Sequence, residues 1–328
     1  MIHALALTGP TASGKTAISI ELSRALDLEV ISCDSMQIYK GMDIGTAKVT
    51  ETERDGTPHH LIDIISPNEQ FSTETYRKMA LEVARDITER GKMPIFVGGT
   101  GLYIDSLTRS AQTEIPESSE EYRAQFEKTG QTDEGREELW KRLSEVDPES
   151  AAAIHKNNTR RVIRALEIYD TTGKPKSYFD KLSRESEKDV SIGMITLDFH
   201  NRENLYSRVD RRVDIMISEG LVDEVVSLIK RGYLTDPMAT ASQAIGYKEI
   251  IAYLDGKCTL SEAVDTIKLS TRRYAKRQLT WFRHEKDAER LYLDLENGDM
   301  KPIDDVMSEA IEYANKYINT YKRSNDFK

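Results

Sequence analysis

The chain of 328 residues has few cysteines and no long apolar run. Its only cysteines, Cys33 and Cys258, lie far apart, so they form neither a metal-ligand spacing nor a disulfide framework. This pattern favours a reducing compartment. No apolar segment is long enough to span a bilayer, and the N-terminus leads into a strand-like segment rather than a signal peptide. We therefore expect no membrane partner and a cytoplasmic location.

The chain also lacks an overall excess of positive charge. Its formal net charge is −10, which on its own argues against a nucleic-acid partner. Binding depends on where the positive charges lie, however, and two stretches concentrate them. The first basic cluster is Lys156, Arg160, Arg161 and Arg164, and the second is Lys268, Arg272, Arg273, Lys276, Arg277 and Arg283. An acidic protein with such clusters can still bind a polyanion.

The strongest motif lies near the N-terminus. The uncharged run 4–7 predicts a buried parallel strand, and the apolar residues of 18–26 recur at helical spacing. Between them the chain fits G-x-x-x-x-G-K-[ST], in the strand–loop–helix context of a phosphate-binding loop. The loop consists of Gly9, Pro10, Thr11, Ala12, Ser13, Gly14, Lys15 and Thr16. A chance match on a structural turn is the alternative.

Each part of this loop has a chemical use. Backbone N–H groups and the helix N-terminus attract a phosphate, and Lys15 supplies a mobile cation. The Thr16 hydroxyl can ligate a magnesium ion that bridges phosphate oxygens. The motif therefore predicts binding of a di- or triphosphate together with Mg.

Two further strand-like segments end on polar residues. Residues 28–33 lead into Asp34, at the strand end where parallel sheets bind ligands, so Asp34 is predicted to be a magnesium partner or a base. Residues 93–97 lead into Gly98-Gly99-Thr100-Gly101, where the backbone can approach a ligand closely and Thr100 offers a hydroxyl. A tight strand-to-helix turn is the alternative for the second segment.

The remaining pattern predicts an α/β fold: a P-loop NTPase-like parallel sheet flanked by helices, with a small all-helical insertion. We expect the core in residues 1–110, a helical and tRNA-binding insertion in 111–190, and a return to the core with C-terminal helices in 191–328. Within the insertion, 159–171 reads as a helix and 174–189 as a loop. Residues 191–199 read as the last strand of the main sheet.

Two C-terminal helical stretches carry arginines that have two interpretations. In 202–231, Arg208, Arg211 and Arg212 either face a ligand or pair in solvent with Asp210 and Asp214. In 260–283, the aromatic and basic end suits either stacking on bases or ordinary helix packing.

Together these segments resemble the bacterial tRNA dimethylallyltransferases, also called the tRNA isopentenyltransferase or IPP transferase family. The resemblance follows the family's order over nearly the full chain and is weakest in 113–150 and the tail. The segments that carry it are 9–16, 34–39, 41–48, 98–103, 161–167, 243–249 and 273–283.

The resemblance implies transfer of a dimethylallyl group from dimethylallyl diphosphate to N6 of the adenosine 3′ of the anticodon, position 37 of tRNA. The phosphate loop and Mg would hold the diphosphate. Asp34 would act as general base and Thr100 would help to place the base or the leaving group. Arg208 would clamp the diphosphate. Because the two cysteines form no closely spaced pair, we expect no zinc-finger extension of the kind found in eukaryotic relatives.

The resemblance also implies contacts with the anticodon stem-loop by a single chain acting as a monomer. The contact implied for Arg123 has the least support, because the residues around it match the family poorly. The implied contacts are Asp34, Ser35, Met36, Gln37, Thr100, Arg123, Arg160, Arg161, Val162, Ile163, Arg164, Gln243, Ala244, Ile245, Gly246, Tyr247 and Lys248.

Three other functions use the same motifs. A P-loop kinase or nucleotide hydrolase would use Asp34 as a magnesium partner. A prenyltransferase could take free AMP or ATP as acceptor, and a non-enzymatic RNA-binding protein could use the loop as a switch. The basic clusters argue against the kinase and against a free-nucleotide acceptor, because neither substrate needs them.

Overall fold

The computed structural model describes residues 1–108, 115, 119–185 and 188–325. The chain forms two compact units. Unit 1 consists of Met1–Leu107 and Val190–Lys328, and unit 2 of Thr108–Asp189. Residues 111–114, 116–118 and 186–187 of the expected helical insertion lie outside the described residues.

Unit 1 is built on a six-stranded sheet in the order β3-β2-β4-β1-β5-β6, and every neighbouring pair is parallel. The central strands are almost continuously buried, because helices cover both faces of the sheet. The α/β fold is therefore confirmed. The strands are β1 Ile2–Thr8, β2 Leu28–Ser32, β3 His59–His60, β4 Met93–Gly98, β5 Val190–Asp198 and β6 Glu289–Tyr292.

The expectation that residues 191–199 form the last strand is wrong. Strand β6 pairs with β5 from Ile195↔Glu289 to Asp198↔Tyr292 and forms the edge of the sheet. It is only four residues long, and Glu289 and Arg290 are exposed. Short, charged edge strands carry no apolar run, so the sequence gives no signal for this one.

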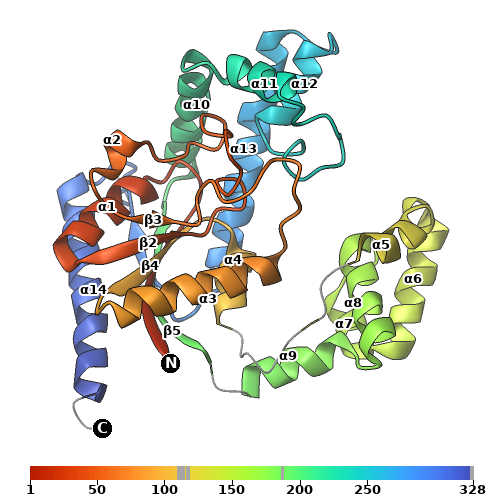
Figure 1. Ribbon diagram of the computed structural model, residues 1–328, viewed down its shortest axis with the longest axis horizontal. Helices are drawn as coiled ribbons and strands as arrows, with labels where there is room; N and C mark the ends of the chain where they lie inside the picture. The colour runs from red at the N-terminus through yellow and green to blue at the C-terminus, as the bar shows by residue number, and fades with distance from the viewer. Residues whose placement is uncertain (109–114, 116–118, 186–187, 326–328) are drawn as a thin grey trace. The chain divides into compact units, whose positions relative to one another are not determined.

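Helices cover the two faces of the sheet (Figure 1). On one face, α1 Lys15–Leu26 and α14 Ile303–Asn325 share a core with the sheet. On the other, α3 Thr73–Glu89 and α4 Gly101–Leu107 do so. Ser72 caps α3 by accepting a hydrogen bond from the Thr75 N–H.

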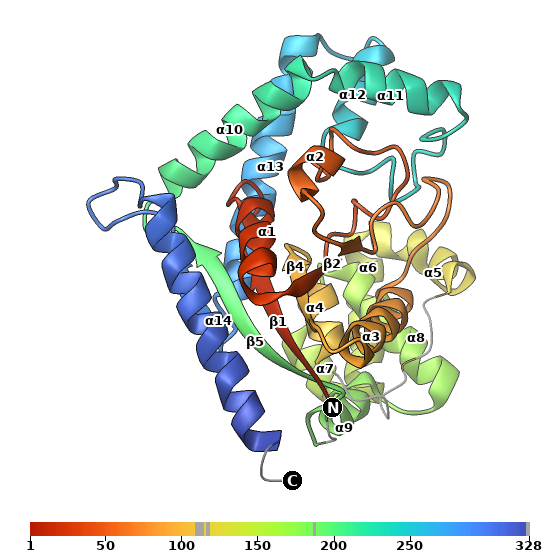
Figure 2. The same ribbon diagram turned by 60° about the vertical axis from the view of Figure 1, so that its left-hand side comes forward.

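A helical layer adjoins the carboxyl ends of the strands. The expected helical stretch 202–231 is two helices that separate at Gly220, whose φ is 99°. Two ion pairs join α10 to α13, which run side by side (Figure 2). The elements are α2 Glu51–Arg54, α10 Arg202–Ser218, α11 Leu221–Lys230, α12 Tyr247–Leu254 and α13 Leu260–Phe282.

Every element described in unit 2 is helical. The helices pack on a core of their own that includes Leu139, Leu143 and Leu166, with Tyr122 and Phe126 at its margin. The elements are α5 Glu120–Glu127, the 3-10 turn η1 Thr129–Gln131, α6 Asp133–Val146, α7 Pro148–Ala153, α8 Thr159–Thr172 and α9 Lys176–Glu185.

The expectation of a loop over 174–189 is wrong, because α9 occupies most of it. The Asp147 carboxylate accepts a hydrogen bond from the Ser177 N–H at 3.0 Å, near the start of this helix. The local sequence is polar on average, which favoured the loop interpretation, but its few apolar residues recur at helical spacing.

Candidate active site

Three loops meet at the carboxyl edge of the sheet because β2, β4 and β1 are neighbours. The Thr8↔Gly98 register brings the end of β1 beside the end of β4. The Thr100 N–H donates to the Cys33 carbonyl at 3.2 Å, and the Ser35 N–H donates to Thr100 Oγ1 at 3.2 Å. The structure therefore brings Asp34 and Thr100, separate in the sequence, to the same edge.

The phosphate loop, residues 9–16, has a backbone shaped for an anion. Gly14 caps α1 in the left-handed region, with φ at 88° and no side-chain hydrogen bond to the helix N-terminus. Ser13 Oγ is buried and has no hydrogen-bond partner among the described residues. Lys15 Nζ donates to the loop's own carbonyls, at 3.1 Å to Gly9 and 2.7 Å to Pro10. A buried hydroxyl with no partner among the described residues and a lysine held by the loop's own carbonyls thus gather where a phosphate would bind.

Burial is the main influence on the charge of Lys15. Burial and, to a smaller extent, the positive charge of Arg212 lower the pKa of Lys15 from 10.5 to about 7, while the negative charge of Asp34 opposes this shift. Burial also lowers the pKa of Arg212, while Asp34 raises it. Asp34, Lys15 and Arg212 therefore form one electrostatic group.

Helix α10 contributes a second arginine. Arg208 Nε donates to the Ala12 carbonyl at 2.8 Å and so fastens the phosphate loop. The expected aspartate partners are engaged elsewhere: Asp214 pairs with Lys268 at 2.6 Å, and Asp210 lies 3.5 Å from Arg272. For Arg208 the structure therefore favours a role at the loop over pairing in solvent.

A cavity of about 490 Å³ opens beside these groups. Thr11 and Asp34 lie on its wall, and Val213, Met216 and Ile267 make part of that wall apolar. Such a site suits a substrate with an anionic end and an apolar end. Other lining residues are Ser35, Met36, Gly45, Thr46, Arg212, Gln243, Ala244, Ile245, Gly246, Tyr247, Lys248, Ser270, Thr271, Arg273, Tyr274 and Arg277.

The second basic cluster separates into two groups. Arg273 and Arg277 are exposed and line the cavity. Arg283 is held by Asp198 at 2.8 Å, and Lys268 and Arg272 face the aspartates of α10. At the end of α13, Phe282 is 1% exposed, which favours ordinary packing over base stacking for this residue.

The residues of unit 1 expected at the tRNA differ in exposure. Gln37 lies within its own loop, where Oε1 accepts from Ser32 Oγ at 3.3 Å and Nε2 donates to the Thr46 and Ala47 carbonyls at 3.4 Å. Residues 243–248 line the cavity. Within them, Gln243 and Lys248 are exposed, Ile245 is half-buried, and Ala244, Gly246 and Tyr247 are buried.

The residues of unit 2 that are expected to contact tRNA also differ in exposure. Arg160 and Arg161 are exposed on α8, and Arg123 is exposed on α5. Arg164 donates to Glu167 at 2.7 Å, and Glu167 is itself buried. Val162 and Ile163 lie in the core of this unit. The side chains available to a polyanion here are the exposed arginines.

Sequence reasoning missed Gln278. Its Oε1 accepts from the Thr11 N–H at 2.8 Å, and its Nε2 donates to the Gly99 carbonyl at 2.9 Å. Gln278 thus joins the phosphate loop to the glycine loop after β4. The chain's only hint was its position among the basic residues of 268–283.

The donor set fits a magnesium ion held mainly by phosphate. Among the residues that the structure describes, no group of three His, Cys, Asp or Glu side chains could hold a metal. Mg²⁺ commonly takes one or two protein ligands with waters and substrate phosphates. Thr16, in the first turn of α1, and Asp34, after β2, are the candidates.

No helix among the described residues is both long and apolar enough to cross a membrane.

The fold is that of an α/β protein of the P-loop type, with a cavity at the carboxyl edge of its sheet. Residues 37–285 match the family described as IPP transferase, and the chain belongs to this family. A tRNA dimethylallyltransferase of Caldanaerobacter subterraneus subsp. tengcongensis is 47% identical over 313 residues, 95% of this chain and 97% of the relative. One from Bacillus cereus is 50% identical over 294 residues, covering 89% of this chain and 90% of the relative.

Solved structures are similar too. The full-length tRNA isopentenylpyrophosphate transferase of Bacillus halodurans has a TM-score of 0.70 and 42% identity, covering 99% of this chain and all of that one. A eukaryotic dimethylallyltransferase acting on tRNA has a TM-score of 0.74 and 30% identity, covering 89% of this chain and 74% of that one.

Proposed function

We propose that this chain transfers the dimethylallyl group of dimethylallyl diphosphate to N6 of the adenosine 3′ of the anticodon in tRNA, which gives N6-isopentenyladenosine. One observation carries the proposal: Asp34, Thr11 of the phosphate loop and the stretch 243–248 line the same cavity. The same cavity therefore has a carboxylate, part of the phosphate loop and an expected RNA-binding segment on its wall. The names of the relatives support the same reaction.

The diphosphate binds at the phosphate loop. The N–H groups at the start of α1, Ser13 Oγ and Lys15 Nζ surround its oxygens, and Lys15 turns from the Gly9 and Pro10 carbonyls to do so. Arg208, which holds the loop through Ala12, and Arg212 add positive charge. Thr16, in the first turn of α1, would hold a magnesium ion together with phosphate oxygens, and that ion would supply positive charge to the leaving group.

Asp34 prepares the acceptor. The N6 amine attacks the carbon of the dimethylallyl group that is bonded to the diphosphate. A C–N bond forms, and the C–O bond to the diphosphate breaks with its electron pair on oxygen. Asp34 accepts the proton that the amine loses. Its Oδ1 accepts a hydrogen bond from the Met36 N–H at 2.9 Å, which orients the carboxylate. Thr100 holds the neighbouring Ser35 backbone.

The RNA binds through exposed cations. Arg160, Arg161 and Arg123 of unit 2, and Arg273 and Arg277 of unit 1, provide phosphate contacts. The target base leaves its stack to reach Asp34 inside the cavity. We further propose that the protein acts on tRNA as a monomer in the cytoplasm.

The direct test is to incubate the protein with total tRNA, Mg²⁺ and labelled dimethylallyl diphosphate, and then to map the labelled nucleoside. We expect label on the adenosine 3′ of the anticodon. ATP turnover without tRNA would favour a kinase or hydrolase, and label on free AMP or ATP would favour a nucleotide acceptor.

Asp34→Asn separates the enzyme from an RNA-binding switch. Because asparagine keeps the size of the side chain but loses the base, we expect tRNA binding to persist and transfer to fall by about 10²- to 10⁴-fold. Unchanged transfer would contradict the role of Asp34.

A further inference from the structure

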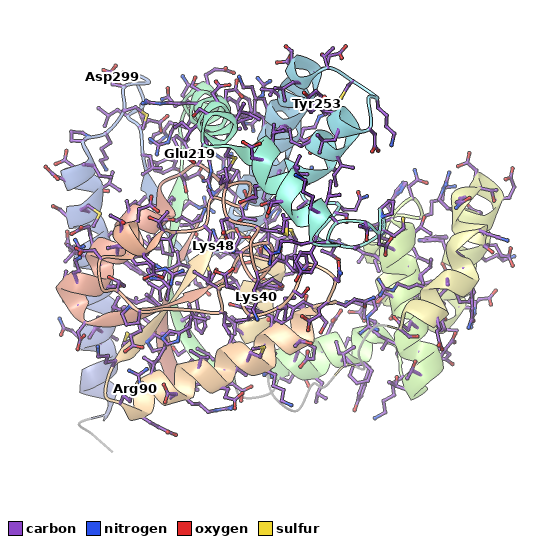
Figure 3. The ribbon with its side chains drawn as sticks, turned by 45° about the horizontal axis from the view of Figure 1, so that its top comes forward. Lys40, Lys48, Arg90, Glu219, Tyr253 and Asp299 are labelled. Atoms are coloured by element: carbon purple, nitrogen blue, oxygen red, sulfur yellow. The ribbon has the colours of Figure 1, made fainter. Side chains whose placement is uncertain are left out.

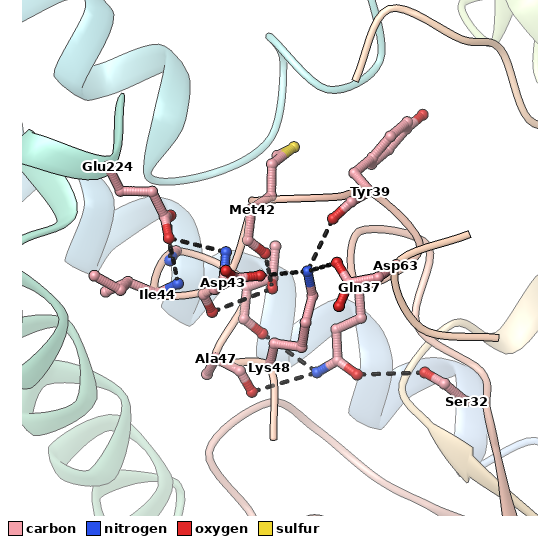
Figure 4. Close-up of polar contacts among 12 residues, drawn as sticks. Ser32, Gln37, Tyr39, Met42, Asp43, Ile44, Ala47, Lys48, Asp63 and Glu224 are labelled. Atoms are coloured by element: carbon pink, nitrogen blue, oxygen red, sulfur yellow. Dashed lines mark hydrogen bonds and ion pairs between the residues drawn. The ribbon is translucent and has the colours of Figure 1, made fainter. Parts of the chain in front are cut away.

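The segment 41–48, here called the Gly45 loop, follows Asp34 in the chain and lines the cavity through Gly45 and Thr46. It contains no helix or strand. Its position therefore depends on side-chain contacts, and two charged groups make most of them: Glu224, which comes from α11, and Lys48, which is the loop's own last residue (Figure 4).

Glu224, in the first turn of α11, holds the outer part of the loop. Its Oε2 accepts from the N–H groups of Asp43 at 2.9 Å and Ile44 at 2.7 Å, and its Oε1 accepts from the Gly45 N–H at 3.1 Å. One carboxylate thus satisfies three consecutive backbone donors. Charge-assisted hydrogen bonds of this kind are roughly twice as strong as neutral ones.

Tyr247 connects this carboxylate to the segment expected to contact tRNA. Its hydroxyl donates to Glu224 Oε1 at 2.6 Å, and its side chain is completely buried. The ring passes so close to Gly45 that a Cβ there would lie 2.5 Å from a ring carbon. Gly45 therefore has to be a glycine for Tyr247 and Glu224 to meet the loop together.

Lys48 holds the inner end of the loop. Its side chain is 4% exposed, and Nζ donates to the Tyr39 carbonyl at 2.9 Å, to Asp43 at 2.6 Å and to Asp63 at 2.5 Å. Lys40, in contrast, is exposed (Figure 3). Gln37 completes the connection, because it bonds the loop's Thr46 and Ala47 carbonyls.

We propose that Glu224 is a positioning residue that fastens the Gly45 loop to Tyr247 and so fixes the cavity wall beside Asp34. This inference rests on the proposed transfer reaction. The hydrogen bonds run without a break from Tyr247 through Glu224 to the loop, and from the loop through Gln37 to Ser32 at the end of β2. Glu224 itself does not line the cavity, so it acts through the loop.

The test compares Glu224→Gln, Tyr247→Phe and the double variant. The glutamine amide offers one acceptor oxygen in place of two, and its NH₂ group cannot accept from a backbone N–H. We expect Glu224→Gln to lower kcat by about 10- to 100-fold through misplacement of the wall, with the Kd of inorganic pyrophosphate changed by less than about twofold.

Tyr247→Phe removes only the hydroxyl, and we expect it to lower kcat by a smaller factor. When Tyr247→Phe is added to Glu224→Gln, kcat should fall by less than about threefold more, because both substitutions break the same connection. Effects that multiply fully would show that the two residues act independently and would overturn the proposal.

Asp223→Asn is the matched control. Asp223 is the exposed neighbour of Glu224 in the same first turn of α11, so the substitution removes the same charge from the helix N-terminus without touching the loop. We expect its kcat to be that of the wild type. An equal loss of kcat in Asp223→Asn would assign the effect to helix electrostatics and overturn the role of Glu224.

Limited trypsin digestion tests the loop without the reaction. We expect Glu224→Gln to speed cleavage after the buried Lys48 by about tenfold or more, with cleavage after the exposed Lys40 unchanged. Unchanged cleavage after Lys48 would refute the fastening even if kcat fell. A wild-type protein with no transferase activity would refute the proposed function, and the digestion would still decide whether Glu224 holds the loop.

Discussion

The free protein should hold Lys15 partly neutral near physiological pH, and a bound diphosphate should restore its charge. Burial and Arg212 lower the pKa of this lysine to about 7. A bound diphosphate places negative charge beside Nζ, which raises the pKa toward the ordinary range of lysine. Binding should therefore be accompanied by proton uptake above about pH 7.

The pKa gives the size of the effect. With a value of about 7 in the free protein, about nine-tenths of the lysines are neutral near pH 8 and about one-tenth near pH 6. Pyrophosphate binding should take up about 0.9 proton near pH 8 and about 0.1 near pH 6 through this group. If only the charged form binds, the apparent affinity should fall by about tenfold for each pH unit above about 7, because the charged fraction falls by that factor.

Titration calorimetry in two buffers with different ionisation enthalpies measures the uptake directly. The ligand also titrates, so Lys15→Arg serves as the reference, because a guanidinium stays protonated throughout this range. The ratio of the two Kd values cancels the ionisation of the ligand. A ratio that does not change between about pH 6 and pH 8.5 would refute the argument that Lys15 is depressed.

Three other predictions concern RNA binding and stability. Arg161→Ala should raise the KM for tRNA and lower the slope of log K against log salt by about one, with the KM for dimethylallyl diphosphate unchanged. An unchanged salt slope would contradict the proposed contact between Arg161 and the tRNA. Glu29→Gln tests a buried carboxylate that Arg90 holds by two hydrogen bonds, which lower the pKa of Glu29 to about 2. The contribution of Glu29 is present above the ordinary carboxyl pKa and is lost as pH falls toward about 2, so urea unfolding should show a loss of about 2 kcal/mol at neutral pH that narrows near pH 3. Gln278→Leu leaves the Thr11 N–H and the Gly99 carbonyl unpaired, and should cost about 2 to 4 kcal/mol of unfolding free energy and weaken pyrophosphate binding; a change below about 0.5 kcal/mol would contradict the bridge.

The sheet could be predicted where its strands are buried on both faces. The mainly apolar runs before Gly9, Asp34 and Gly98 were visible in the sequence, and the sheet order makes their ends neighbours. That order explains why loops from three strands converge. The edge strand β6 was missed because half of it is exposed and charged. Helix α9 was missed because its residues are polar on average, although its few apolar residues recur at helical spacing.

Contacts over long sequence separation could not be predicted in the same way. Gln278 reaches Thr11 across 267 positions, and no motif marks it. Glu224 is one of two adjacent acids at a helix start, and the sequence does not say which of them faces a loop some 180 residues earlier. Local patterns determine strands and turns, whereas the packing of α10 to α13 determines these partners.

The roles of the arginines of α10 could be predicted from the sequence only in part. Arg208 and Arg212 are four residues apart, so they share a helix face, and both are directed at the site: one holds the Ala12 carbonyl, and the other lines the cavity near Asp34. The sequence reasoning chose Arg208 alone as the diphosphate clamp. The helical spacing already implied that a face carrying Arg208 to the phosphate loop would carry Arg212 with it, one turn further along. What only the fold supplies is that Asp210 and Asp214, the acids that flank these arginines in the sequence, face Arg272 and Lys268 of α13 instead.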